Sequence, residues 1–262
     1  MRVTILGAGS SGGVPLVGFE WGACDPDNPK NLRTRPSLLI EIEGRTFLID
    51  TSPDLRQQLL TAGVRRLDAV LYTHAHADHL NGMDDLRGIN RAMHAPLDFY
   101  CDATTLETIR QRFGYVLDPL RPGADRYYKP VLHPHVVQPG DLFEVAGVAM
   151  QVFDQDHGFS RTLGYRIGDF GYSTDLVEMS DAAFAALDGI HTWVLGCFTD
   201  QPHMTHVHLP KALEWIERLR PERTILTHLG PDLDYEALSA KLPDGVVAAY
   251  DGFDFEVPSR AA

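Results

Sequence analysis

One short segment constrains the fold more than any other. It follows an apolar stretch, residues 68–73, and four of its six residues carry imidazole or carboxylate groups: His74, His76, Asp78 and His79. These groups are common ligands of zinc and related divalent cations. In an extended chain alternate residues share a face, and a turn into a helix would bring His79 to the same side. The segment therefore predicts a metal site at the end of a buried strand.

The rest of the chain alternates strand-like and helix-like segments. Nine strands are predicted from β-branched or alternating apolar residues, over residues 2–6, 37–43, 45–50, 68–73, 148–154, 162–168, 169–173, 191–197 and 223–228. Helices are predicted over residues 52–63, 209–220 and 234–242. Two strand-rich halves, each followed by helices, predict an α/β fold of two packed sheets with helices outside. We expect a single domain over residues 1–262.

Local signals refine this expectation. Residues 43–45 predict a hairpin turn, while Ser52 and Gly63 are placed to begin and end the first helix. Residues 246–257 predict a closing pair of strands, and the proline-containing residues 112–135 a long surface loop. Long loops in compact domains often carry function.

Composition excludes several classes of protein. The formal net charge of −13 disfavours an extended nucleic-acid-binding surface, because phosphate backbones select clustered Lys and Arg. No apolar run is long enough for a membrane span, and the N-terminus resembles a strand more than a signal segment. The three cysteines, Cys24, Cys101 and Cys197, are far apart and odd in number. We therefore expect a cytoplasmic protein with reduced thiols and no membrane partner.

The glycines at positions 7, 9 and 12 match the G-x-G-x-x-G spacing of a dinucleotide-binding turn. That turn requires a helix after the glycines and an acidic residue that ends a second strand. Here the glycines lead instead into the turn-like, proline-rich residues 21–31. We therefore expect no dinucleotide cofactor.

The residues that follow the strand ends resemble the metallo-β-lactamase superfamily. Residues 74–79 are similar to its H-x-H-x-D-H signature, and His157, Asp175 and His228 match its remaining ligands in order. The resemblance implies a four-layer αββα sandwich and two metals with seven ligands: His74, His76 and His157 for one, Asp78, His79 and His228 for the other, and a bridging Asp175. Two such cations would activate a bridging hydroxide. The ligand types suit zinc and also admit manganese or iron.

Within this superfamily, several stretches are similar to the PhnP family of phosphoribosyl 1,2-cyclic phosphate phosphodiesterases: residues 7–15, 72–82, 172–175, 205–228 and 242–257. The resemblance implies hydrolysis of a small cyclic or diester phosphate, such as a ribose cyclic phosphate or a nucleotide. Asp78 would orient the hydroxide, and His206 would protonate the leaving oxygen or stabilise phosphoryl charge. His208 and His203 are weaker candidates for that role. The resemblance also favours a homodimer.

The chain departs from the PhnP pattern at a second, structural zinc site. Where that family carries cysteines and a histidine, this sequence has Phe19, Trp21, Cys24 and Pro231. We expect this zinc to be absent, with aromatic packing in its place and Cys24 as a buried or loop thiol.

Other functions are also compatible with the same fold. Residues 48–60 look like a segment of PqqB-type proteins, which implies a non-catalytic biosynthetic or binding protein. Ribonuclease Z and glyoxalase II-type thioesterases share the ligand pattern, although the negative charge disfavours tRNA binding. Because every ligand position is filled, the hydrolase reading is preferred.

A further group of residues has no assigned role. Candidates for contact with substrate or with a second subunit are Arg87, Ser160, Arg161, Tyr127 and Tyr128. Histidines without a partner pattern are expected to be structural or to lie on the surface: His94, His133, His135 and His191.

Overall fold

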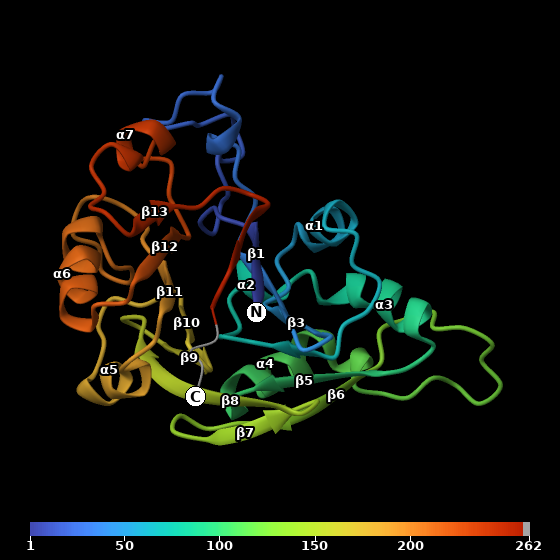
Figure 1. Ribbon diagram of the computed structural model, residues 1–262. Coiled ribbons are helices and arrows are strands. Elements are labelled where there is room, and N and C mark those ends of the chain that lie inside the picture. Colours follow the sequence, from blue (N-terminus) through green and yellow to red (C-terminus); the bar gives the residue numbers. More distant parts are fainter. Residues whose placement is uncertain (259–262) are drawn as a thin grey trace.

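The computed structural model describes residues 1–258. Two seven-stranded sheets pack face to face, and helices cover both outer faces (Figure 1). The predicted four-layer arrangement is thus confirmed. None of the helices in the described part of the chain is both long enough and apolar enough to cross a membrane.

The first sheet runs in the order β14-β1-β2-β3-β4-β5-β6. In that order its strands are Phe253–Glu256, Arg2–Gly7, Ser37–Ile42, Arg45–Ile49, Ala69–Leu71, Leu97–Cys101 and Leu132–Val136. Its outer face carries α1, α2, α3 and α4: Leu55–Thr61, Ala77–Leu80, Leu86–Met93 and Ala103–Phe113. Short 3₁₀ turns η1, η2 and η3 occupy Pro29–Asn31, Met83–Asp85 and Gly114–Val116.

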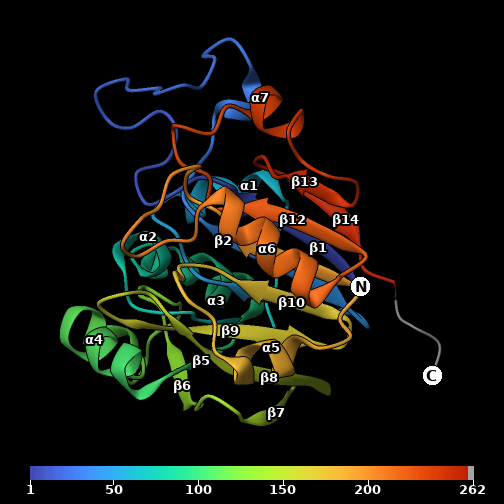
Figure 2. The same cartoon turned by 90° about the vertical axis from the view of Figure 1, so that its left-hand side faces the viewer.

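The second sheet runs in the order β13-β12-β11-β10-β9-β8-β7. In that order its strands are Val246–Ala248, Arg223–Thr227, Thr192–Gly196, Phe170–Ser173, Arg161–Ile167, Val148–Asp156 and Leu142–Val145. Three helices belong to this half of the molecule: α5, α6 and α7, which span Asp181–Leu187, Leu209–Leu219 and Tyr235–Ser239. Figure 2 looks onto this sheet, with α5 and α6 lying across its strands.

Apolar side chains fill the spaces between these layers. Ile40 of β2 and Val152 of β8 belong to the core between the sheets. Leu59 of α1, Ile89 of α3 and Ile109 of α4 pack on the outer face of the first sheet. Each such fully buried side chain contributes about 1.5–3 kcal/mol through removal from water. The strand ends are thereby held on a rigid scaffold.

The structure differs from two local expectations. The first helix begins at Leu55, with Asp54 rather than Ser52 at its N-cap position. The predicted closing pair is wrong as a pair, because β13 lies beside β12 in one sheet and β14 beside β1 in the other. The chain between them passes from sheet to sheet through residues 249–252. The hairpin turn is confirmed, with Glu43 and Gly44 both at positive φ.

Strand direction gathers the important chain segments at one edge. β10, β11 and β12 are parallel, and β9 is antiparallel to both β8 and β10. The carboxyl ends of β8, β10 and β12 therefore lie at the same edge of the second sheet. The residues after β4 meet this sheet, since Leu163 N–H donates to Thr73 O at 2.9 Å and Tyr165 O–H to Tyr72 O at 2.7 Å.

The glycine-rich turn after β1 passes close to neighbouring backbone. A Cβ at Gly7 would lie 2.0 Å from Arg35 O, and one at Gly9 would lie 2.8 Å from Thr34 O. Beyond the turn, Ser10 N–H donates to Leu229 O at 3.2 Å. These glycines thus permit close backbone packing beside the segment that follows β12.

Gly82 makes a similar approach below α2. Its N–H donates to Thr51 O at 2.9 Å, and an added Cβ would lie 1.9 Å from Ser52 O. Since the obstacle is backbone, a side chain at this position would push α2 away from the loop between β3 and α1.

We therefore expect Gly82→Ala to destabilise the protein by at least about 2 kcal/mol, because the clash requires a backbone shift. Gly88→Ala is the matched control, since its Cβ would enter open space within α3. That variant should gain about 0.5–1 kcal/mol from improved helix propensity. Denaturant unfolding of the metal-stripped proteins measures the free energy of unfolding of both variants and of the parent. Equal stability of Gly82→Ala and the parent would contradict the packing described.

Candidate metal centre

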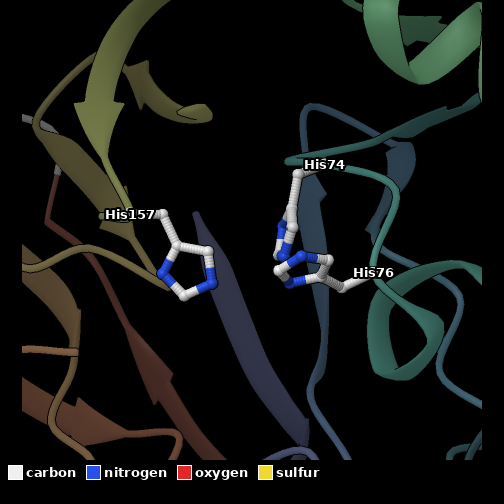
Figure 3. A group of neighbouring side chains, drawn as sticks. All are labelled: His74, His76 and His157. Carbon is white, nitrogen blue, oxygen red and sulfur yellow. The ribbon is translucent and has the colours of Figure 1, made fainter. Parts of the chain in front are cut away.

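The predicted ligands all follow strand ends at the shared edge. His74 and His76 come after β4, and α2 begins at Ala77. His157 follows β8 directly, and Figure 3 shows its ring facing those of His74 and His76 from the other side of the site. Asp175 and His228 follow β10 and β12 in the same way.

The side chains form two neighbouring groups. Within each group the ligand atoms lie within 4.8 Å of one another. The groups are His74, His76 and His157, and Asp78, His79, Asp175 and His228. All are buried except His76, which is exposed. Asp175 joins the groups, because its Oδ1 lies 3.7 Å from His157 Nε2 and its Oδ2 lies 3.0 Å from His79 Nε2. The structure thus brings together all seven residues that the sequence proposed as ligands.

The histidine rings present unused nitrogen atoms to the centre. His79 Nδ1–H donates to Asp50 Oδ2 at 2.6 Å, and His157 Nδ1–H donates to Thr205 O at 2.7 Å. Thr73 Oγ1 donates to Asp50, so it accepts from His74 Nδ1–H at 3.0 Å. Each bond selects the tautomer whose neutral form carries its lone pair on Nε2.

Several polar atoms of these side chains are buried without a hydrogen bond: His74 Nε2, Asp78 Oδ2, His79 Nε2, and both ring nitrogens of His228. Buried polar atoms are normally satisfied, so unsatisfied atoms clustered at one point require an explanation. His79 Nε2 lies only 3.0 Å from a carboxylate oxygen, yet the two do not meet at hydrogen-bonding angles. Imidazole and carboxylate lone pairs directed at one point fit divalent cations.

Electrostatics agree with this fit. Burial lowers the pKa of His74 well below its ordinary value, which favours the neutral ligand form. Burial opposes ionisation of Asp175, but His228 and His79 hold its pKa well below the usual range. Burial also disfavours charge on His79, whereas Asp175, Asp78 and Asp50 raise its pKa well above the ordinary value. The carboxylates thus create a negative pocket that stabilises a cation.

Asp50 is an important residue that the sequence analysis missed. It is fully buried at the end of β3. Besides its bond from His79, it accepts from Thr73 N–H at 2.8 Å and from Thr73 Oγ1 at 2.7 Å. It therefore positions two histidines of the centre. Its place at the end of a strand, like that of Asp175, was the only available signal.

Backbone strain is concentrated at the same place. Asp50, Asp175 and His228 have φ values of 61°, 52° and 57°, in the left-handed region that favours glycine. Such conformations cost of order 1 kcal/mol or more each and persist where surrounding contacts enforce them. Here they direct the three side chains into the site.

His206 lies beside the ligands. Its ring stacks on that of His228 with centroids 5.1 Å apart, and its Nδ1 lies 3.7 Å from Asp175 Oδ1. It forms a third group of metal-competent side chains with His157 and Asp175. Burial lowers the pKa of His206 to about 3, although Asp175 opposes this shift. His206 is therefore placed to touch whatever the centre binds.

The neighbouring candidates are placed less directly. His203 is exposed, and its ring centroid lies 5.3 Å from that of His206. His208 occupies the N-cap position of α6, where its side chain makes no capping bond. Two apolar side chains beside the site are largely exposed: Phe159 at 83% and Met204 at 70%. Their loops touch, since a Cβ at Gly158 would lie 2.7 Å from Met204 O.

Other residues singled out from the sequence lie in local networks. Arg161 forms ion pairs with Asp154 and Asp156, and Ser160 O accepts from His157 N–H at 3.0 Å. His133 and His135 both lie near Asp98, and His191 pairs with Glu222. His94 is the left-handed C-cap residue of α3. Arg87 Nη1 lies 3.4 Å from Tyr128 O, and Arg91 Nε donates to Tyr127 O at 2.6 Å.

The expected aromatic replacement for the structural zinc is wrong. Phe19 is 86% exposed and Trp21 is only half-buried, so these rings do not fill the position. The buried Arg33 lies there instead, with Nη1 4.0 Å from Cys24 Sγ. Its Nη2 donates to Leu233 O at 2.8 Å, joining the loop after β1 to the loop after β12. A guanidinium with several fixed donors is suited to this bridging role.

Residues 45–229 match the family described as "Beta-lactamase superfamily domain". This match includes the whole of the predicted ligand set. The chain belongs to the metallo-β-lactamase superfamily. A solved diphosphatase from the PhnP family is 32% identical, with a TM-score of 0.89 and 98% of both chains covered. Zinc-bound PqqB from Methylobacterium extorquens has a TM-score of 0.76 at 19% identity, which shows the shared superfamily fold.

Sequence relatives carry different names. A protein of Porphyromonas gingivalis named octanoyltransferase is 36% identical over 260 residues, which cover 97% of this chain but only 51% of that protein. A ribonuclease Z of Mycobacterium marinum is 30% identical over 188 residues, which cover 67% of this chain and 62% of that enzyme. The chain thus spans about half the length of the first of these relatives.

Asp50→Asn tests how the centre is organised. The amide cannot accept from both His79 and Thr73 in the same way, so the imidazoles lose their fixed orientation. We expect affinity for zinc to fall about 10- to 100-fold, as for other residues that orient metal ligands. Competition with a chromophoric chelator measures this affinity. Asp98→Asn, on the exposed face of β5, is the control and should bind zinc normally; normal binding by Asp50→Asn would contradict the assigned role.

Proposed function

We propose that the protein is a metal-dependent phosphodiesterase that hydrolyses a small cyclic or diester phosphate. The observation that carries the proposal is the set of seven converging side chains with unsatisfied inward atoms. The similarity to a PhnP-family diphosphatase over nearly the whole chain supports chemistry at phosphorus.

Seven ligands in two groups suggest two divalent cations, zinc or manganese. His74, His76 and His157 would hold one cation, and Asp78, His79 and His228 the other, with Asp175 between them. When bound, such a pair supplies an activated water and neutralises charge that develops on phosphoryl oxygens. The protein contributes the fixed imidazole orientations and the two ionised carboxylates.

Asp78 lies at the start of α2 with its Oδ2 3.5 Å from His228 Nε2 and 3.2 Å from His79 Nε2. From this position Asp78 would help to hold a cation and would orient an attacking water. We assign Asp78 this second task as well as ligation.

His206 completes the reaction site in our proposal. Its ring is held between Phe198, at a centroid distance of 5.0 Å, and His228. The side chain is 15% exposed, so part of it is accessible to a bound molecule. From there it would donate an N–H to a phosphoryl oxygen of the substrate, where charge grows during the reaction.

A second candidate substrate is a diphosphate, favoured by the name of the PhnP-family relative. Both reactions begin with the same attack at phosphorus. They differ in the leaving group, which is an alkoxide from a diester and a phosphate from a diphosphate. Turnover of a ribose cyclic phosphate, a dialkyl phosphate and inorganic diphosphate by the metal-loaded enzyme separates these candidates.

His206→Ala tests the catalytic assignment. We expect kcat/KM for a phosphodiester to fall about 100-fold or more, since a positioned hydrogen-bond donor to developing charge is lost. Because the donor faces a phosphoryl oxygen, the loss should be similar for p-nitrophenyl and alkyl leaving groups. A loss that grows steeply with the basicity of the leaving group would assign proton donation instead.

His208→Ala is the matched control, two residues along the same segment, and should retain normal turnover. Metal content must be equal in the parent, His206→Ala and His208→Ala, because His206 lies near the proposed ligands His157 and Asp175. Unchanged turnover by His206→Ala with metals bound would remove His206 from the mechanism.

A further inference from the structure

A separate groove on the outer face of the first sheet is lined by residues of α1, α3 and the turns beside them. Figure 1 shows where these two helices lie. The groove encloses about 340 Å³. Four arginines line it: Arg56, Arg65, Arg87 and Arg91. None of the seven proposed metal ligands is among the lining residues, so this groove is distinct from the metal centre.

Asp85 interacts electrostatically with Arg56 and Arg87 and offsets part of their positive charge, but the groove keeps an excess of positive charge. Among the described residues, none of the four forms an ion pair with a carboxylate within 4.0 Å, whereas Arg35 and Arg161 both do. The one acidic lining residue is Asp85, beside the stronger positive charge of four guanidiniums. On a chain of net charge −13, such a local concentration of unpaired arginines selects an anion.

The chain also fixes two of the guanidiniums in place. Arg91 Nε donates to Tyr127 O at 2.6 Å, and Arg87 Nη1 lies within 3.4 Å of Tyr128 O. Both carbonyls belong to residues 117–131, the long connection between η3 and β6. Because these carbonyl oxygens carry no net charge, they hold the two arginine side chains without neutralising them. The guanidiniums therefore remain able to bind an anion. Arginine arranged in this way suits phosphate or carboxylate.

The remaining lining is apolar. Leu59 and Ile89 are buried, with only 6% and 5% of their surface exposed, whereas Leu60 is 61% exposed. Val64, in the turn that follows α1, also lines the groove. The groove therefore offers an apolar surface beside its charged rim, and its volume lies in the range that holds small organic ligands.

We propose that this groove is a binding site for a small amphipathic anion, an organic phosphate or carboxylate with an apolar body. The anionic group is bound by the arginines, and the apolar body lies on Leu60 and its neighbours. A purely inorganic anion would leave the apolar surface exposed, and a neutral lipid would leave the guanidiniums unpaired. This site is independent of the proposed phosphodiesterase activity.

Calorimetric titration of the metal-loaded protein with octyl phosphate tests the site, with inorganic phosphate as the second probe. Octyl phosphate should bind at least about tenfold more tightly than inorganic phosphate, given the apolar area its chain buries. Arg65→Gln/Arg87→Gln should weaken octyl phosphate binding by at least about tenfold, through loss of charged hydrogen bonds. Leu60→Asn should weaken octyl phosphate binding but leave inorganic phosphate binding unchanged.

The matched control is Arg110→Gln/Arg121→Gln, since both arginines are exposed and lie outside the groove. It should bind octyl phosphate as the parent does. Circular dichroism confirms that each variant is folded. Undiminished octyl phosphate binding in Arg65→Gln/Arg87→Gln would overturn the site, and equal affinity of the parent for the two probes would overturn its amphipathic character.

Discussion

The structure depends on one electrostatic constraint at the shared edge of the two sheets. Asp78, Asp175 and Asp50 are all buried there, and burying ionised carboxylates is costly unless positive charge or hydrogen bonds compensate them. Asp50 is compensated by Thr73 and His79, whereas Asp78 Oδ2 makes no hydrogen bond. The imidazole nitrogens around it are equally unsatisfied. Cations at this point would compensate both kinds of group together.

The fold provides this arrangement through its strand ends. Parallel strands deliver His157, Asp175 and His228 to one edge, and the segment after β4 meets them from the opposing sheet. Left-handed backbone at Asp175 and His228 turns the chain sharply as it leaves each strand. The cost of this strain is offset by the apolar layers on both sides of each sheet. Rigid supports of this kind preserve ligand geometry.

Sequence reasoning succeeded where local pattern and chemistry coincide. The spacing of residues 74–79 and their place after an apolar strand were sufficient to find half of the centre, and the superfamily resemblance supplied His157, Asp175 and His228. Asp50 was missed because its partners are distant in sequence and an aspartate after a strand is common. The roles of Arg33 and of the arginine groove depend on tertiary neighbours that no local pattern encodes. The final two strands, β13 and β14, were predicted to pair with each other because they are adjacent in sequence. Instead β13 pairs with β12 in one sheet and β14 with β1 in the other.

Elemental analysis of purified protein, combined with phosphodiester turnover before chelation, after chelation and after metal return, tests whether the seven converging side chains hold a catalytic metal pair. We expect about two divalent metals per chain, as for a paired site. Turnover should disappear when the metals are removed and return when they are restored. Protein that holds no metal, and takes up none when zinc or manganese is supplied, would contradict the assignment of these residues as metal ligands.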